Sequence, residues 1–243
     1  MARLLVTRAE PDAHETLARL AALGIEGVVA PLLEYAPLHT GLPDAAGFAA
    51  VALTSANALR ALEERQALAP FRRLKLFAVG DRTAEAARAY GFTDVVCSGG
   101  TLRQLVEEIA AAGLAGPVFY PTARHQSGDL AQELAPAGIM VVGARVYEMR
   151  AAAALPPDVL SDLGANRFDG VLFYSRRTAE TFIGLTRTLD RPHRSRLGVL
   201  CLSEQVAEPL VEAHFVRVGL AEHPSEEAMM TLALSFARDQ NAS

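Results

Sequence analysis

Two blocks of sequence each occur twice in this chain, with the copies about 120 residues apart. The clearest pair is Phe48–Asn57 and Phe168–Arg177, where an apolar run reaches a serine and the following residues turn helical. Ser55 in the first copy therefore corresponds to Ser175 in the second. At both places we expect a buried strand that delivers a hydroxyl residue to the start of a helix.

A second block lies upstream of each copy, where Leu20–Val28 parallels Leu134–Val142. Downstream, Leu76–Ala84 matches Val199–Ala207. We call the upstream block (Leu20–Val28) X and the block from Phe48 to Ala84 Y, and their copies X′ and Y′. The chain then runs in the order X, Y, X′, Y′. Solenoid repeats are only about 20 to 50 residues long, and this much longer period indicates a duplicated domain instead. A chain of 243 residues then divides into two domains of about 110 to 120 residues each.

The composition, with 51% hydrophobic and 21% charged residues, is ordinary for a globular protein. No apolar run approaches the roughly 18 residues that a membrane crossing needs, and Met1–Arg3 lead into the first apolar strand without a signal-peptide pattern. We therefore expect no membrane partner and a cytoplasmic location. The net charge of −5 argues against nucleic acid as a partner, although a locally positive cleft could still bind an anion.

Several enzyme classes leave no trace in the sequence. The glycine fingerprint of dinucleotide sites, the P-loop motif and the nucleophile elbow of hydrolases are all missing. Cys97 and Cys201 lack metal-ligand spacing and are expected as buried thiols rather than as a disulfide. The six histidines are scattered along the chain, so no metal site is expected.

Apolar runs alternate regularly with helical segments. Strands are expected at residues 4–7, 25–30, 49–54, 75–79, 94–97, 118–120, 139–147, 169–174, 198–202 and 215–218. Connectors at 34–46 and 148–157 interrupt this rhythm, and residues 187–196 are expected as a basic polar loop. The alternation predicts an α/β fold in which parallel sheets are flanked by helices on both faces.

Small polar residues gather where the predicted strands end. In open parallel sheets, ligands bind beyond the carboxyl ends of the strands, where helix N-termini present free amides. Hydroxyl residues beside glycines let backbone N–H groups approach an anion, so these positions suit carboxylates or phosphates. The candidates are Thr7, Arg8, Ser55, Ala56, Asn57, Gly80, Thr83, Arg124, Ser175, Arg176 and Ser203.

Each candidate also has a structural interpretation. Serine and threonine are the commonest helix N-caps, so Ser55, Thr101 and Ser175 could serve only as caps. An isolated arginine such as Arg8 is usually a solvated charge. Tyr147, at the end of a predicted strand, could give a proton or a hydrogen bond to a leaving group, or could simply pack at an interface.

Several short stretches are weak one by one but form a specific pattern through their order, spacing and duplication. They are Leu5–Arg8, Leu53–Ala58, Ala78–Gly80 with Thr83 and Ala84, Gly128–Leu130 with Leu134, Val146–Tyr147, Phe173–Ser175 and Pro224–Ser225. In these stretches the chain resembles the uroporphyrinogen-III synthase family along essentially its whole length.

The resemblance implies two similar α/β domains joined by a two-strand linker, with the active site in the cleft between them. It implies a discontinuous first domain, residues 1–35 plus 152–243, and a second domain of residues 38–149. The residues alone leave a tandem division into 1–112 and 113–243 equally open. The implied reaction dehydrates linear hydroxymethylbilane and closes it, with inversion of ring D through a spiro intermediate, to uroporphyrinogen III in tetrapyrrole biosynthesis, without a cofactor.

By position, Tyr147 matches the family tyrosine proposed to assist departure of the hydroxyl group. The other candidates match the amide and hydroxyl arrays that would bind the eight carboxylates of the substrate. Ser203–Val206 departs from the pattern, because many relatives have a glycine followed by threonines there, so the contacts of that loop stay open. A monomer is expected. The rival interpretation is a non-catalytic two-lobed binding protein for a polycarboxylate metabolite.

Overall fold

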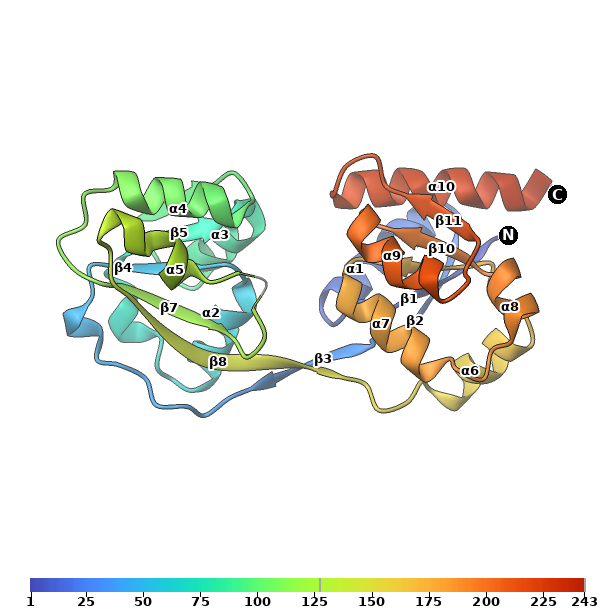
Figure 1. Cartoon of the computed structure of the whole chain (residues 1–243), viewed down its shortest axis with the longest axis horizontal. Helices are drawn as coiled ribbons and strands as arrows, with labels where there is room; N and C mark the ends of the chain where they lie inside the picture. Colours follow the sequence, from blue (N-terminus) through green and yellow to red (C-terminus); the bar gives the residue numbers. More distant parts are fainter. Residues whose placement is uncertain (127, 243) are drawn as a thin grey trace. The chain divides into compact units, whose positions relative to one another are not determined.

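The computed structural model describes residues 1–126 and 128–242. The chain forms two compact units (Figure 1). Unit 1 consists of Met1–Glu34 and Arg150–Ser243, and unit 2 of Tyr35–Met149. The boundaries fall inside two strands, β3 (Leu33–Pro37) and β8 (Val141–Ala151), so the chain passes from one unit to the other within extended segments.

Unit 1 is built on a five-stranded sheet in the order β11-β10-β9-β1-β2. Its strands are β1 (Arg3–Val6), β2 (Glu26–Val29), β9 (Gly170–Phe173), β10 (Gly198–Cys201) and β11 (Arg217–Leu220). Every neighbouring pair is parallel. β1, which precedes the crossing to unit 2, therefore lies beside β9, which follows the return, and Leu4 is aligned with Gly170.

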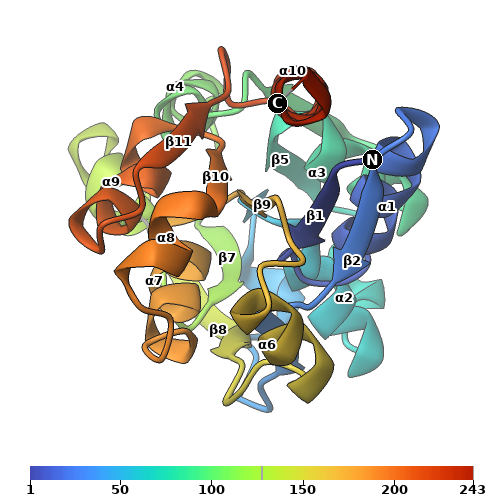
Figure 2. The same ribbon diagram turned by 90° about the vertical axis from the view of Figure 1, so that its right-hand side faces the viewer.

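Helices cover both faces of the unit 1 sheet (Figure 2). They are α1 (Asp12–Ala22), α6 (Pro157–Gly164), α7 (Arg176–Leu185), α8 (Arg191–Arg196), α9 (Glu204–Glu212) and α10 (Glu226–Ala242). One face packs Phe173, Phe182 and Phe215 with residues of α6, α7 and α9. The other face packs β1 against α1 and α10. Gly198 is required there, because an added Cβ would lie 2.4 Å from Cζ of Phe236.

Unit 2 is built on a six-stranded sheet in the order β3-β8-β7-β4-β5-β6. The remaining strands are β4 (Ala50–Leu53), β5 (Lys75–Val79), β6 (Val95–Ser98) and β7 (Val118–Ala123). The pairs from β8 to β6 are parallel. All four residues of β4 are buried, which fits a central strand covered on both faces.

The helices of unit 2 also form two layers. They are α2 (Ala56–Glu64), α3 (Gly80–Ala89), α4 (Leu102–Ala111) and α5 (Leu130–Leu134), with short 3₁₀ helices at Ala45–Gly47, Ala69–Phe71 and Ala135–Ala137. Residues of α2 and α3 pack on one face of the sheet, and residues of α4 and α5 on the other. The predicted α/β class with parallel sheets between helices is confirmed.

The two sheets have the same spatial order although the chain visits them differently. Unit 1 reads β2-β1-β9-β10-β11, and unit 2 reads β8-β7-β4-β5-β6 with β3 added at its β8 edge. β2 and β8 begin in the X block and its copy, whereas β4 and β5 lie in the Y block and β9 and β10 in its copy. Unit 2 therefore has the same arrangement with its blocks in the reverse chain order.

Two segments differ from the sequence expectation. Residues 187–196 were expected as a polar loop, but α8 lies within them; Asp190 caps this helix by accepting a hydrogen bond from the His193 amide at 3.1 Å, and a proline stands in its first turn. The start of the connector at 34–46 is occupied by β3, which begins at Leu33 and pairs at the edge of the unit 2 sheet. Among the helices in the described part of the chain, none has the length and apolar character that a membrane span requires.

Candidate functional site

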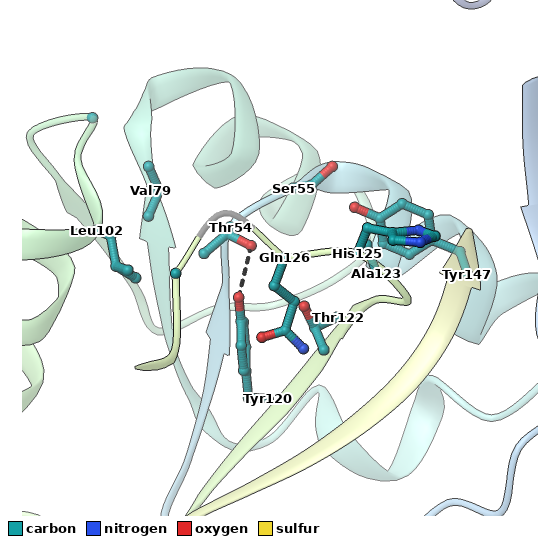
Figure 3. A pocket seen from close by; sticks show the side chains of 12 residues that line it. Thr54, Ser55, Val79, Leu102, Tyr120, Thr122, Ala123, His125, Gln126 and Tyr147 are labelled. Atoms are coloured by element: carbon teal, nitrogen blue, oxygen red, sulfur yellow. Dashed lines mark hydrogen bonds between the residues drawn. The ribbon is translucent and has the colours of Figure 1, made fainter. Parts of the chain in front are cut away.

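A cavity of about 330 Å³ lies in unit 2 at the carboxyl ends of β4, β5 and β7 (Figure 3). Its walls mix hydroxyl, amide and aromatic groups with backbone. They are formed by Thr54, Ser55, Val79, Gly100, Leu102, Tyr120, Thr122, Ala123, His125, Gln126, Gly128 and Tyr147. This is the edge of a parallel sheet at which ligands generally bind.

Ser55 reaches this cavity because β4 ends just before it and α2 begins just after it. Its side-chain oxygen accepts a hydrogen bond from the Asn57 amide at 3.2 Å, which caps the helix. The hydroxyl proton is left to point elsewhere, so the capping and ligand-binding interpretations are compatible. Ala56 and Asn57 form the first turn, and the Asn57 side chain approaches the sulfur of Met149 at 3.9 Å.

Tyr147 owes its direction to a bulge in β8. The pairing of β7 with β8 runs regularly as far as Thr122 and Arg145, and then skips one residue, so that Ala123 is aligned with Tyr147. A bulge of this kind turns the following side chain to the other face of the sheet. Tyr147 consequently packs in the core on the α2 side, with only 6% of its surface exposed.

Burial also fixes the chemical state of Tyr147. Removal from water raises the pKa of its hydroxyl above the usual value of 10.0, and the neighbouring Ser55 side chain counteracts this only in part. The ring stacks on Tyr35, with 6.0 Å between the ring centroids. The phenol is therefore a protonated donor at neutral pH, held by packing at the wall of the cavity.

Tyr120 lines the cavity although it was not among the site residues predicted from the sequence. The side chain is only 5% exposed, and its hydroxyl lies 3.1 Å from Oγ1 of Thr54. The feature that could have identified it is a tyrosine inside a short, mostly apolar strand that also contains a proline. His125, which was expected as a surface histidine, is exposed and also lines the cavity.

Gly80 and Thr83 flank the cavity rather than line it. Gly80 opens α3 with a positive φ of 73°, and an added Cβ would approach Cα of Gly100 to 3.7 Å. This glycine lets the turn after β5 lie close to the loop that carries Gly100, which is itself part of the cavity wall. Thr83 follows within the same helix and is buried.

Arg124 lies beside the cavity. Its guanidinium pairs with Glu148 at 2.8 Å, and its backbone amide donates to the carbonyl of Tyr147 at 2.8 Å. Glu148 is nearly buried, so this pair ties the end of β7 to the end of β8. Part of the charge of Arg124 is therefore already balanced by the protein.

The candidates of unit 1 have partners within that unit. Thr7 is fully buried, and its hydroxyl donates to the carbonyl of Leu172 at 2.7 Å. The Arg8 guanidinium pairs with Asp12 at 2.9 Å and with Glu226, and it lies 4.0 Å from the centre of the Tyr174 ring. Both residues stabilise unit 1, and their contact with substrate stays a prediction.

The remaining unit 1 candidates lie at helix starts. The Ser175 oxygen accepts from the Thr178 amide at 3.2 Å and caps α7. Arg176 pairs with Glu180 at 3.0 Å and with Glu208. Ser203 occupies the cap position of α9, yet its side chain makes no capping hydrogen bond. Of these three side chains, Ser203 is therefore the least committed to the fold.

A metal site does not emerge from the described residues. Within 1–126 and 128–242, no group of three or more histidine, cysteine, aspartate or glutamate side chains is arranged to hold a metal ion. Cys97 and Cys201 are free thiols, as the sequence predicts; Cys201 is buried as expected, but Cys97 is only half-buried. The expectation that no cofactor is used stays a prediction.

Comparison with known proteins gives a consistent result. A uroporphyrinogen-III synthase from Synechococcus elongatus is 28% identical over 199 residues, which cover 75% of this chain and 74% of that protein. The crystal structure of uroporphyrinogen-III synthetase from Helicobacter pylori has the same fold, with a TM-score of 0.68 and 22% identity over 97% of this chain and 99% of that one. A mutant uroporphyrinogen III synthase from Thermus thermophilus, at 15% identity and complete coverage of both chains, gives a TM-score of 0.57. The family model described as uroporphyrinogen-III synthase HemD matches residues 14–231, and the chain therefore belongs to the uroporphyrinogen-III synthase family.

Proposed function

We propose that this protein is a uroporphyrinogen-III synthase that converts hydroxymethylbilane to uroporphyrinogen III. The reaction removes water from the substrate's hydroxymethyl group and closes the ring with inversion of the last pyrrole. The observation that carries the proposal is the buried, protonated phenol of Tyr147 at the wall of a polar cavity beside Ser55.

In the first step the protein has to supply little more than a proton. The pyrrole that carries the hydroxymethyl group supplies the electron pair that expels its oxygen, so the carbon–oxygen bond breaks as a proton reaches that oxygen. In this proposal Tyr147, which lines the cavity, gives this proton, and water leaves. A positioned general acid contributes about 10²- to 10⁴-fold to such a step.

The second task is to hold the chain in the geometry that leads to inversion. Without the enzyme, the azafulvene formed by water loss closes directly, without turning the last ring. The cavity around Tyr120, Thr54 and Thr122 can hold a pyrrole ring against this simpler closure. We expect the amides at the start of α2 to contribute carboxylate contacts.

A product-isomer assay tests the proposal. Purified protein is mixed with synthetic hydroxymethylbilane, and the oxidised products are separated by chromatography against a reaction without enzyme. We expect rapid formation of isomer III. Only isomer I, at the rate of the uncatalysed reaction, would defeat the proposal and leave a binding protein for a polycarboxylate.

The setting of the activity is part of the proposal. We infer that the protein works in the cytoplasm as a monomer, because unit 2 alone supplies the cavity and the proposed proton donor. Sedimentation of the active enzyme at assay concentration would test the oligomeric state.

A further inference from the structure

A second cavity, of about 510 Å³, adjoins the Tyr147 cavity in unit 2. The two share Tyr120, Gln126 and Gly128 in their walls. The two cavities are therefore neighbours in the same unit. We propose that the second cavity is a subsite for an acidic side arm of the substrate and that Arg145 binds its carboxylate; this rests on the proposed function.

The second cavity exists because α5 is short. In unit 1, the 11-residue helix α1 follows the corresponding strand and covers β2 closely: a Cβ added at Gly27 would lie 2.5 Å from Cδ1 of Leu17. In unit 2, α5 has 5 residues. A Cβ added at Gly143 of β8 would meet only the carbonyl oxygen of Tyr120, at 3.9 Å. The same fold thus leaves this face of β8 open in unit 2.

Arg145 brings an unbalanced positive charge to this open face. The side chain is exposed, it lines the cavity, and no carboxylate of the described residues lies within ion-pair distance of its guanidinium. The neighbouring Arg124 is paired with Glu148 at 2.8 Å. Asp129, the acid in the cavity wall, directs Oδ1 at the amides of Ala131 and Gln132, at 3.0 and 3.1 Å. The positive charge of Arg145 therefore stays available for an anion.

The bulge in β8 relates Arg145 to the proposed proton donor. Side chains two residues apart on a regular strand share a face, but the skipped residue sends Tyr147 into the first cavity while Arg145 stays with the second. One strand therefore offers a proton donor and a cation to two adjoining cavities. A pyrrole with an acidic side arm likewise carries its reacting carbon and its carboxylate at different positions, and a guanidinium can bind that carboxylate with two parallel hydrogen bonds.

The test compares Arg145→Gln and Arg145→Lys with the wild-type enzyme. Arg103→Gln serves as the control, because Arg103 is an exposed arginine of unit 2 that pairs with Glu107 and lines neither cavity. We expect Arg145→Gln to raise KM for hydroxymethylbilane by about ten- to a hundredfold with a much smaller change in kcat. Arg145→Lys should recover part of the affinity, and Arg103→Gln should behave like the wild type.

A binding measurement separates this inference from the proposed function. Calorimetric titration with uroporphyrinogen III under nitrogen, which involves no turnover, should show weaker binding to Arg145→Gln by a similar factor. An unchanged KM and an unchanged affinity in Arg145→Gln, with wild type making isomer III, would overturn the subsite alone. Absence of isomer III from the wild type, with affinity still dependent on Arg145, would instead overturn the proposed function and keep the subsite.

Discussion

At the scale of single residues, burial decides what Tyr147 can do. Burial raises the pKa of its hydroxyl, so the phenol carries its proton before the reaction and can donate a hydrogen bond or that proton. The sequence placed this tyrosine at a strand end, but burial and the bulge that aims it depend on pairing with β7. A register shift of one residue depends on the partner strand and cannot be read from the sequence of β8 alone; beyond the shift Val146, Tyr147 and Glu148 are all buried, so the alternation of buried and exposed residues is lost there.

We predict that Tyr147→Phe lowers turnover of hydroxymethylbilane by about ten- to a thousandfold, since the ring stays and the proton donor is lost. Because the pKa of Tyr147 lies above 10.0, the wild-type hydroxyl stays protonated from pH 6 to pH 9, and the ratio of the two rates should be constant over that range. Initial rates with chromatographic product analysis measure both effects. Tyr90→Phe is the control, because Tyr90 lies in the same unit and does not line the cavity. Equal turnover of Tyr147→Phe and wild type would leave Tyr147 as a packing residue.

At the scale of elements, the same hydroxyl pattern has different consequences at different helices. The sequence predicted hydroxyl residues at the starts of α2, α4 and α7, and Ser55, Thr101 and Ser175 indeed cap them. Capping depends on local spacing, which is why sequence reasoning succeeds there. Ser203 has the same position before α9 but makes no capping hydrogen bond. This difference between the serines cannot be predicted from the sequence pattern. Arg145 was not predicted as a site residue for a related reason: its exposure depends on the short helix α5, which the sequence pattern does not reveal.

The two serines of unit 1 provide a matched test. Ser175→Ala should lower the free energy of unfolding by about 1 kcal/mol, because the amide of Thr178 loses its partner. Ser203→Ala should change it by less than about half as much, since no capping bond is lost. Urea unfolding followed by circular dichroism measures both variants. Equal destabilisation by the two substitutions would contradict the assigned difference.

At the scale of the whole molecule, the arrangement of the chain was the hardest feature to predict. The repeat established that two similar units exist, but X could pack with either copy of Y. Which copy of Y packs with X is decided by long-range strand pairing, because β1 pairs with both β2 and β9. No local sequence pattern predicts that pairing. The resemblance to a family supplied that choice at the sequence level.

A fragment of residues 33–151 contains every strand of the unit 2 sheet and both of its core clusters. We predict that it folds on its own and unfolds cooperatively. Residues 1–112 are the control, because that fragment holds β1 and β2 without β9 and lacks β7 and β8 beside β4. Circular dichroism and amide NMR spectra of both fragments would decide. A disordered 33–151 fragment, or a cooperatively folded 1–112 fragment, would refute the assignment of two separately stable units.

The discontinuity of unit 1 has a consequence during synthesis on the ribosome. Leu4 is aligned with Gly170, so the first strand emerges long before the neighbour that completes its sheet. At about 5 to 20 residues per second, the amino-terminal segment waits on the order of ten seconds or more with an apolar strand edge uncovered. Unit 2 is finished in that interval. In the nascent protein, unit 2 can therefore fold first, and the sheet of unit 1 can be completed only when translation is nearly over.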